Sequence, residues 1–529
     1  MNIIHAISLF YFSIYIIYIT FVKEYRINVC RKIILTGKDM KKITLLILGL
    51  LSLFSLIGTS CDGLDEHYST NPNYRLSFSV DTLSFDTVFT TIGSATKQFM
   101  VYNPNKEALN IQSIMLASGG ESGFRLNVDG RKGDYFDNVG ILAEDSMFVF
   151  VEVNVNPNDS NQPLLVEDSV VFMTNGGKQT VLLEAYGQNM HLYKGGLHIM
   201  KDTTFTADLP HLVYDSIMVA EGATLHLTEG ATLYMHDKAN IVVSGRLISE
   251  GSLENPVVIR GDRLDFVLDD ILPYDRTPGQ WGGIFFKSGS FGNRMEHTIV
   301  RNGTSGITIE ASEPVDTKLE ISNSQLTNMK GNVLTSINSK LMVTNTEISN
   351  AGGTVVALAG GDYQFTHCSL VNYMRLVQRS TECLVMANAY MQNSENKVVP
   401  LKARFDNCLV DGSFGAGKNP LSGEIALSSV DEADFNYYFN HCVLTTVGSD
   451  NGCFESTLFT TEDNYPSYRK TGGEANKYQF DFRPDTVISL GVGKADPAVS
   501  ANYPVDRLGI NRLESSDGPT IGAYELVKE

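Results

Sequence analysis

The sequence lacks paired cysteines, has an excess of acidic over basic residues, and contains few helix-forming stretches. Its 41 Lys and Arg face 60 Asp and Glu, so the net charge is −19. Such a surface disfavours nucleic acid and anionic lipid headgroups, and polyanionic sugars would need a local basic patch. None of the seven cysteines forms a CxxC pair, which gives no sign of a zinc or redox motif. Helix-forming stretches rich in Ala, Glu and Lys are also few beside 46 Gly and 23 Tyr, which favours an all-β chain.

Six segments share one pattern: an apolar residue, any residue, Asn or His, a small Ser, Thr or Cys, any residue, and an aliphatic. They span 295–300, 321–326, 343–348, 365–370, 405–410 and 439–444, and an Asn or Asp usually follows soon after. Two consecutive spacings are both 22 residues, since 343 − 321 = 22 and 365 − 343 = 22. A short period of strand-forming residues and turn residues predicts a coil of strands.

The Asn or His of each motif should lie where the chain bends, because Asn tolerates a left-handed backbone. Three motifs carry His297, His367 and His441, which raises the question of a metal site. On a coil these histidines would lie roughly 14 and 10 Å apart, too far to share one ion, so no metal site is predicted. Three motifs, two of them among the histidine motifs, carry a cysteine: Cys368, Cys408 and Cys442. A free buried stack and one disulfide both remain open for these cysteines.

Glycines separate short strands at 219–233 and 241–251, followed by Glu254-Asn255-Pro256 and Trp281-Gly282-Gly283. These runs resemble the opening turns of right-handed parallel β-helix domains in bacterial surface proteins. The resemblance implies a parallel β-helix over 191–455, with about ten coils along roughly 50 Å. Residues 456–529 end in Ile521-Gly522-Ala523-Tyr524-Glu525 and resemble the closing segment of such proteins. We expect that segment to cap the solenoid.

Residues 74–190 alternate apolar and polar positions in short runs broken by turn residues, which predicts an antiparallel β-sandwich. The order of Gly93, Asn103, Pro157 and Thr174-Asn175 resembles the immunoglobulin-like domains named after the abnormal-spindle and hydin proteins. The resemblance implies an immunoglobulin-like domain, which we expect to serve as a spacer. The fold class is therefore all-β: sandwich, right-handed parallel β-helix and C-terminal cap.

The N-terminal region contains an export signal. Met40-Lys41-Lys42 precedes an apolar run over 43–58, and Cys61 follows. Residues 40–60 resemble Gram-negative lipoprotein signal peptides, although Gly58 stands where such signals usually have Leu. The resemblance implies a lipid on Cys61, a tether over 61–73 and, from the acidic residues Asp62, Asp65 and Glu66, display on the outer cell surface. Residues 1–39 are interpreted as a start-site artefact, with translation from Met40, or as an extra membrane helix.

Known chemistry of β-helix proteins is hard to find in this chain. The family includes polysaccharide lyases and hydrolases, but the hydrolase signatures Asn-Thr-Asp and Gly-His-Gly and the lyase signature Asn-Gly-Gly/Ala-Glu are absent. No catalytic residue or cofactor is predicted. The best candidate for Ca²⁺ is an acidic stretch that lacks the glycine-bearing loop pattern, so we expect a solvated loop there: Asp262, Asp265, Asp269, Asp270 and Asp275.

The period fails twice, where the spacings grow to 405 − 365 = 40 and 439 − 405 = 34 residues. Extra residues should form loops, and loops on a rigid scaffold often carry binding sites. The hypothesis is a ligand groove flanked by basic and aromatic side chains, and the alternative is a loop that only covers a coil. The candidate residues are Arg375, Arg379, Tyr390, Tyr437 and Tyr438.

Together these features predict a lipid-anchored protein of the outer membrane, displayed at the cell surface. Its expected function is non-catalytic binding of a glycan or another surface partner. Two alternatives stay open: a β-helix polysaccharide lyase or glycoside hydrolase, and a purely structural surface protein.

Overall fold

The computed structural model describes residues 67–158, 161–268, 271–415, 423–448 and 451–527, and this part is built almost entirely of strands. Its helices are four short segments: η1 (Tyr274–Arg276), η2 (Glu474–Asn476), α3 (Pro497–Ser500) and η3 (Arg512–Glu514). None of the described helices is long and apolar enough to cross a bilayer. The all-β prediction is confirmed.

The N-terminal strands form two five-stranded sheets around a shared apolar core. One sheet has the order β1 (Ser77–Phe78), β3 (Lys97–Tyr102), β8 (Ser146–Val153), β5 (Phe124–Val128) and β6 (Arg131–Gly133). The other has the order β2 (Thr82–Phe89), β10 (Gly177–Gln188), β9 (Leu164–Thr174), β4 (Leu109–Leu116) and β7 (Tyr135–Ile141). The predicted antiparallel sheets are confirmed, with one exception, since β2 and β10 run parallel. No hairpin joins these two strands, so no turn imposes the antiparallel direction.

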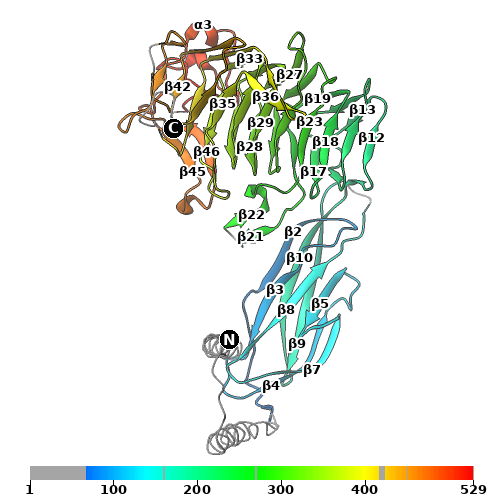
Figure 1. Cartoon of the computed structure of the whole chain (residues 1–529). Coiled ribbons are helices and arrows are strands. Elements are labelled where there is room, and N and C mark those ends of the chain that lie inside the picture. The colour runs from blue at the N-terminus through cyan, green and yellow to red at the C-terminus, as the bar shows by residue number, and fades with distance from the viewer. Residues whose placement is uncertain (1–66, 159–160, 269–270, 416–422, 449–450, 528–529) are drawn as a thin grey trace, which may run out of the picture. The chain divides into compact units, whose positions relative to one another are not determined.

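The following strands wind through three parallel sheets in turn, with one strand per sheet in each coil up to β42, which confirms the parallel β-helix (Figure 1). Sheet C, the largest, contains β11 (His191–Tyr193), β14 (His211–Val213), β17 (Thr232–Met235), β20 (Val257–Gly261), β25 (Thr298–Arg301), β28 (Gln325–Met329), β31 (Glu347–Ala351), β34 (Ser369–Asn372), β39 (Leu409–Gly412), β42 (Val443–Leu444) and β44 (Leu458–Phe459). Sheet D contains β12 (Leu197–Ile199), β15 (Ile217–Val219), β18 (Asn240–Val243), β23 (Gly283–Phe286), β26 (Ile307–Ile309), β29 (Leu334–Ile337), β32 (Val356–Ala359), β35 (Leu384–Ala387) and β40 (Ile425–Ser428). Sheet E contains β13 (Thr203–Phe205), β16 (Thr224–Leu227), β19 (Arg246–Glu250), β24 (Asn293–Glu296), β27 (Thr317–Ser322), β30 (Lys340–Thr344), β33 (Gly361–Thr366), β38 (Leu401–Asp406), β41 (Phe435–Asn440) and β43 (Phe454–Glu455).

Three two-stranded hairpins project from this scaffold or follow it. They are β21 (Phe266–Leu268) with β22 (Leu272–Pro273), β36 (Ala389–Gln392) with β37 (Glu395–Val398), and β45 (Tyr468–Thr471) with β46 (Phe480–Pro484). The second hairpin lies in the 40-residue spacing of the repeat, where extra residues were expected.

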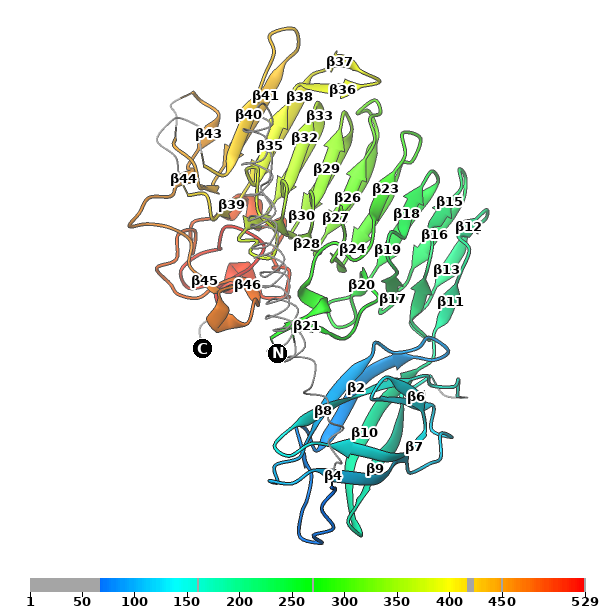
Figure 2. The ribbon, with the colours of Figure 1, turned by 60° about the horizontal axis from the view of Figure 1, so that its bottom comes forward.

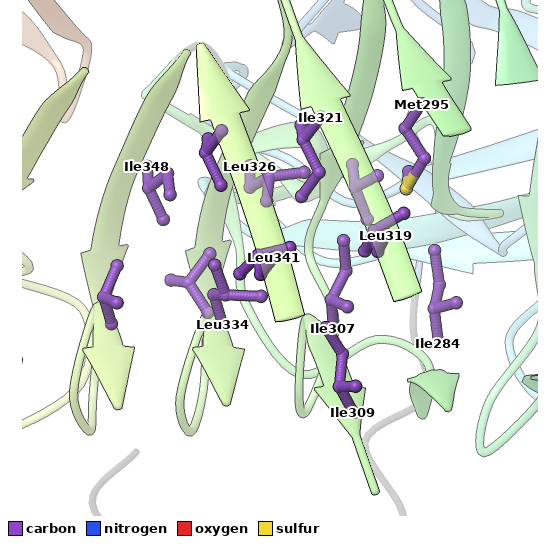
Figure 3. Close-up of a cluster of buried hydrophobic side chains, with 14 of the residues drawn as sticks. Ile284, Met295, Ile307, Ile309, Leu319, Ile321, Leu326, Leu334, Leu341 and Ile348 are labelled. Carbon is purple, nitrogen blue, oxygen red and sulfur yellow. The ribbon is translucent and has the colours of Figure 1, made fainter. Parts of the chain in front are cut away.

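Aliphatic side chains from the three sheets fill the solenoid interior in layers, as Figure 3 shows for Ile307, Leu334 and their neighbours. Each inward position stacks on its counterpart in the next coil because strands pair in register, as Ile321 does with Val343. In later coils the column becomes aromatic: Phe365, Phe405, Phe439 and Phe454 stack with ring centroids 5.0, 4.7 and 5.6 Å apart. Burial of this column stabilises the coils through the hydrophobic effect.

The Asn or His of all six motifs adopts a left-handed backbone, with φ between 42° and 53°, which confirms the predicted bends. These residues form one corner between sheets E and C: His297, Asn323, Asn345, His367, Asn407 and His441. The next residue in each motif is fully buried and donates a side-chain hydrogen bond to the carbonyl two residues earlier, as Thr346 and Cys408 do. Cys368, Cys408 and Cys442 therefore take the structural place of Ser and Thr, and they are free thiols.

The C-terminal segment packs against this corner instead of only closing the last coil. The Asp496 backbone N–H donates to the Asn407 side-chain oxygen at 2.7 Å, and the Arg512 guanidinium donates to the Asn345 side-chain oxygen at 3.1 Å. His367 contacts the Ser500 hydroxyl at 3.0 Å, and burial lowers the pKa of this histidine well below its usual value. Three of the six corner residues, Asn345, His367 and Asn407, therefore contact the C-terminal segment.

Candidate functional site

A groove of about 390 Å³ lies on the outer face of sheet C, between two segments that are far apart in the sequence. One segment follows the β21–β22 hairpin, and the other includes the β45–β46 hairpin; Figures 1 and 2 both show them on this side of the solenoid. The groove is lined by Asp275, Arg276, Arg301, Gln325, Thr327, Asn328, Glu347, Asn350, Lys470, Tyr478, Gln479, Phe480, Asp481 and Arg483.

The floor consists of outward-facing side chains from three neighbouring strands. Gln325 on β28 pairs in register with Glu347 on β31, and Thr327 pairs with Arg301 on β25. Alternation along a strand turns these residues outward, because Leu326 between them points into the core. The solenoid therefore holds polar groups on a rigid surface.

Two hydrogen-bonded segments form the walls. Arg276, at the end of η1, donates a hydrogen bond to the Lys477 carbonyl at 3.0 Å and so joins the walls. On the opposite wall Lys470 donates to the Gln479 side chain at 2.5 Å. Asp481 and Arg483 extend from the same face of β46 and form an ion pair.

Each carboxylate that lines the groove already has donors. Asp275 forms ion pairs with Arg260 and Arg301, both at 2.9 Å. Glu347, which is 4 % exposed, accepts hydrogen bonds from Gln325, Ser349 and Tyr524.

Hydrogen bonds to Asp481 stabilise its charged form and so lower its pKa. Burial raises this pKa, but hydrogen bonds from Arg483 outweigh burial and leave it below the ordinary value. A general acid in glycoside hydrolysis instead needs a raised pKa, so Asp481 is suited to binding more than to acid catalysis.

A second row of asparagines, one per coil, follows the motifs at the end of sheet C strands: Asn302, Asn328, Asn350 and Asn372. Protein groups bind three of them. Asn302 donates to the carbonyl of Asp275, Asn350 accepts from the Tyr373 backbone, and Asn372 bonds both polar backbone groups of Ala351.

Asn328 is the exception in this row. It is 8 % exposed and lines the groove, and its buried carboxamide oxygen accepts no hydrogen bond from the described residues. The carboxamide oxygen of Asn302 is unpaired as well, but the Asn302 amide donates to the Asp275 and Thr277 carbonyls. The Arg301 Nε, also buried at the groove, lacks an acceptor there as well. Leaving such groups unpaired costs about 1–3 kcal/mol each, so a ligand that supplies their partners gains affinity.

The lining suits a ligand rich in hydroxyls. A carboxamide offers one acceptor and two donors, which matches a hydroxyl's ability both to donate and to accept. The half-buried Tyr478 adds an apolar ring to these polar groups. Apolar surface with a few placed polar groups is the usual composition of a small-molecule or sugar site.

The five residues predicted from the interrupted period lie elsewhere, and none of them lines this groove. Arg375 donates to the Thr471 carbonyl, and Tyr390 lies in the β36–β37 hairpin. Tyr437 and Tyr438 are neighbours on β41 but face opposite ways: Tyr437 packs on the core, whereas Tyr438 stacks with Arg404. The structure therefore brings only these last two together, and on opposite faces of one strand.

Arg379 is buried and paired within the scaffold. Its guanidinium is 4 % exposed and pairs with the buried Glu424 at 2.6 Å. It also donates to the Asn372 carbonyl and the Ser413 hydroxyl. These contacts tie the loop after β34 to the following coil.

The acidic stretch considered for Ca²⁺, which we expected to be a solvated loop, has basic partners at several of its described residues. Asp262 contacts His236 at 2.6 Å and Asp265 pairs with Arg263 at 2.5 Å, while Asp275 belongs to the groove. Asp269 and Asp270 lie outside the described residues, as do Cys61 and the whole predicted signal region. Over the described ranges, no cluster of three His, Cys, Asp or Glu is arranged to hold a metal ion.

Most of the groove could not be predicted from the sequence, although one part of the repeat pattern includes a groove residue. The polar residue after each motif marks the second asparagine row and includes Asn328. The repeat alone could not show which member of that row lacks a partner. That depends on where the distant walls pass.

No known protein family matches the sequence, and no curated protein matches it. Among solved structures, the catalytic domain of Agl-KA is 10% identical over 69% of this chain and 79% of its own, with a TM-score of 0.28. The catalytic domain of a GH87 alpha-1,3-glucanase is 9% identical over 69% and 88%, with a TM-score of 0.18. A family 123 glycoside hydrolase from Clostridium perfringens is 6% identical over 23% of this chain, which spans only 30% of that enzyme, with a TM-score of 0.16. Such low TM-scores carry no argument about the activity of this protein.

Proposed function

We propose that this protein binds a glycan in the sheet C groove without cleaving it. The observation that carries the proposal is the unpaired carboxamide of Asn328 on the groove floor. The paired carboxylates around it favour binding over acid–base catalysis, because each already forms an ion pair or accepts hydrogen bonds.

A glycan array followed by calorimetry on the mature protein tests this proposal. Wild type should bind at least one glycan, and Asn328→Ala should weaken that binding about tenfold, the equivalent of one lost hydrogen bond at about 1.4 kcal/mol. Gln364→Ala, an amide variant on the outer face of sheet E, should bind like wild type. Equal affinity in wild type and Asn328→Ala would overturn the site, and release of shortened chains would overturn the non-catalytic assignment.

We also propose that a lipid on Cys61 anchors the protein in the outer membrane and displays it at the cell surface. The lipoprotein-like signal ahead of this cysteine supports the assignment. In cells, wild type should partition into detergent and be digested by external protease. Cys61→Ala should instead partition into the aqueous phase, and unchanged detergent partitioning of that variant would contradict the anchor.

A further inference from the structure

The groove carries more positive charge than the chain around it. Four bases line it and three acids line it, so 4 − 3 leaves +1 in a protein whose net charge is −19. The local sign is therefore opposite to that of the chain. A local basic patch of this kind is what an acidic protein needs to approach a polyanion.

Two of these bases have no carboxylate within ion-pair distance among the described residues. Arg276 bonds to the Lys477 carbonyl and Lys470 bonds to the Gln479 amide oxygen, and both acceptors are neutral. In contrast, Arg301 and Arg483 each have an aspartate. Arg276 and Lys470 therefore retain their full charge for a ligand.

Arg276 and Lys470 also lie on opposite walls of the groove. Arg276 belongs to η1 on one wall, Lys470 belongs to β45 on the other, and both side chains are half-buried. Charges held in a partly enclosed polar cleft are screened less than charges on an open surface. An anionic group between the walls would lie near both bases while the sugar hydroxyls reach the Asn328 floor.

We infer that the glycan bound in this groove is anionic and that Arg276 and Lys470 recognise its carboxylate or sulfate groups. This inference rests on the proposed function, since it specifies the ligand of the same groove. It also explains how a strongly acidic protein can hold an acidic polymer: the attraction is local and comes from two bases without acidic partners.

Two pairs of probes separate the carboxylate from the sulfate. An oligogalacturonide and its methyl ester share a backbone and differ in carboxylate charge, and dextran sulfate and dextran differ in sulfate. In calorimetry at low salt, wild type should bind at least one acidic probe ten or more times tighter than its neutral counterpart. The preference should shrink as salt is raised.

Arg276→Gln with Lys470→Gln should abolish this preference, so that the ratio of the acidic-probe affinity to the neutral-probe affinity falls to about one. The control, Lys340→Gln with Lys402→Gln, removes the same charge from the outer face of sheet E and should keep the preference. Circular dichroism should show that both double variants are folded.

The outcomes distinguish the two proposals. Equal binding of acidic and neutral probes that still depends on Asn328 would overturn the anionic ligand and leave the glycan groove standing. A preference that survives in the Arg276 and Lys470 double variant would also overturn this inference. If wild type bound none of the four probes and no glycan on the array, both the glycan groove and the anionic ligand would be overturned.

Discussion

The outer face of sheet C divides into two halves that share one backbone and differ in what covers them. From β34 to β44 the outward residues include Val371, Leu409 and Val443, and the C-terminal segment packs on them with Phe482 and Ile521. From β25 to β31 the outward residues that line the groove are polar: Arg301, Gln325, Thr327 and Glu347. We call these the covered half and the groove half. The fold supplies the same surface in both halves, and the outward side chains decide whether the chain's own end packs on it or leaves a groove.

In the covered half, the largest change in the free energy of unfolding should come from breaking the buried ion pair of the C-terminal segment. Arg512 and Glu525 are 0% and 2% exposed and lie 2.9 Å apart. Arg512→Met should lower the free energy of unfolding by about 3–5 kcal/mol, because it leaves a buried carboxylate unpaired. Urea denaturation measures the change.

A double variant provides the control for that pair. Arg512→Met with Glu525→Leu removes both charges and should recover most of the lost stability, since buried ion pairs can be replaced by apolar residues. A loss below about 1 kcal/mol in the single variant would show that this pair does not secure the segment.

The apolar packing of the covered half should matter slightly less. Phe482 is 3% exposed and contacts Tyr373 and Tyr468, with ring centroids 6.1 and 5.4 Å away. Phe482→Ala should cost about 3 kcal/mol by leaving a cavity. Because Asp481 and Arg483 lie on the other face of the same strand, glycan affinity should fall as well. Phe148→Ala, at a site 44% exposed, should change unfolding by less than about 0.5 kcal/mol.

The sequence could predict the solenoid but not the groove, and the reason is physical. The bend at Asn345 depends on local backbone preference, which a motif carries within six residues. The groove depends on contacts such as that between Arg276 and Lys477, which are 201 residues apart. The role of Arg379 was equally hidden, because its buried partner Glu424 lies on a later coil. Periodicity describes which residues face outward and not what passes over them.

The contributions of acidic residues to stability should change with pH in opposite directions in the two halves. In the covered half, burial raises the pKa of Asp411 despite hydrogen bonds from Thr445, Tyr373 and Tyr468. Its stabilising contribution is full below the unfolded pKa and is lost as pH rises through the folded pKa. Asp411→Asn does not titrate and should gain stability relative to wild type as pH rises.

In the groove half, Asp481 has a lowered pKa, so its contribution is present above the unfolded pKa and lost as pH falls through the folded pKa. Asp481→Asn should therefore lose stability relative to wild type at neutral pH. The effect is a change in slope, measured by urea denaturation between pH 3 and pH 8. Parallel slopes for the two variants would contradict the distinction between the halves.

The smallest change in stability should come from the residue that matters most for binding. Asn372→Ala should cost about 1–3 kcal/mol, because it strips both hydrogen bonds from the buried Ala351 backbone. Asn328 lies in the same row but has no such bonds, so Asn328→Ala should change the free energy of unfolding by less than about 0.5 kcal/mol. Urea denaturation of the two variants, paired with glycan binding, separates a structural amide from one kept free for a ligand. If Asn328→Ala destabilised the protein as much as Asn372→Ala, the unpaired carboxamide would belong to the scaffold, and the two halves of sheet C would differ in packing alone.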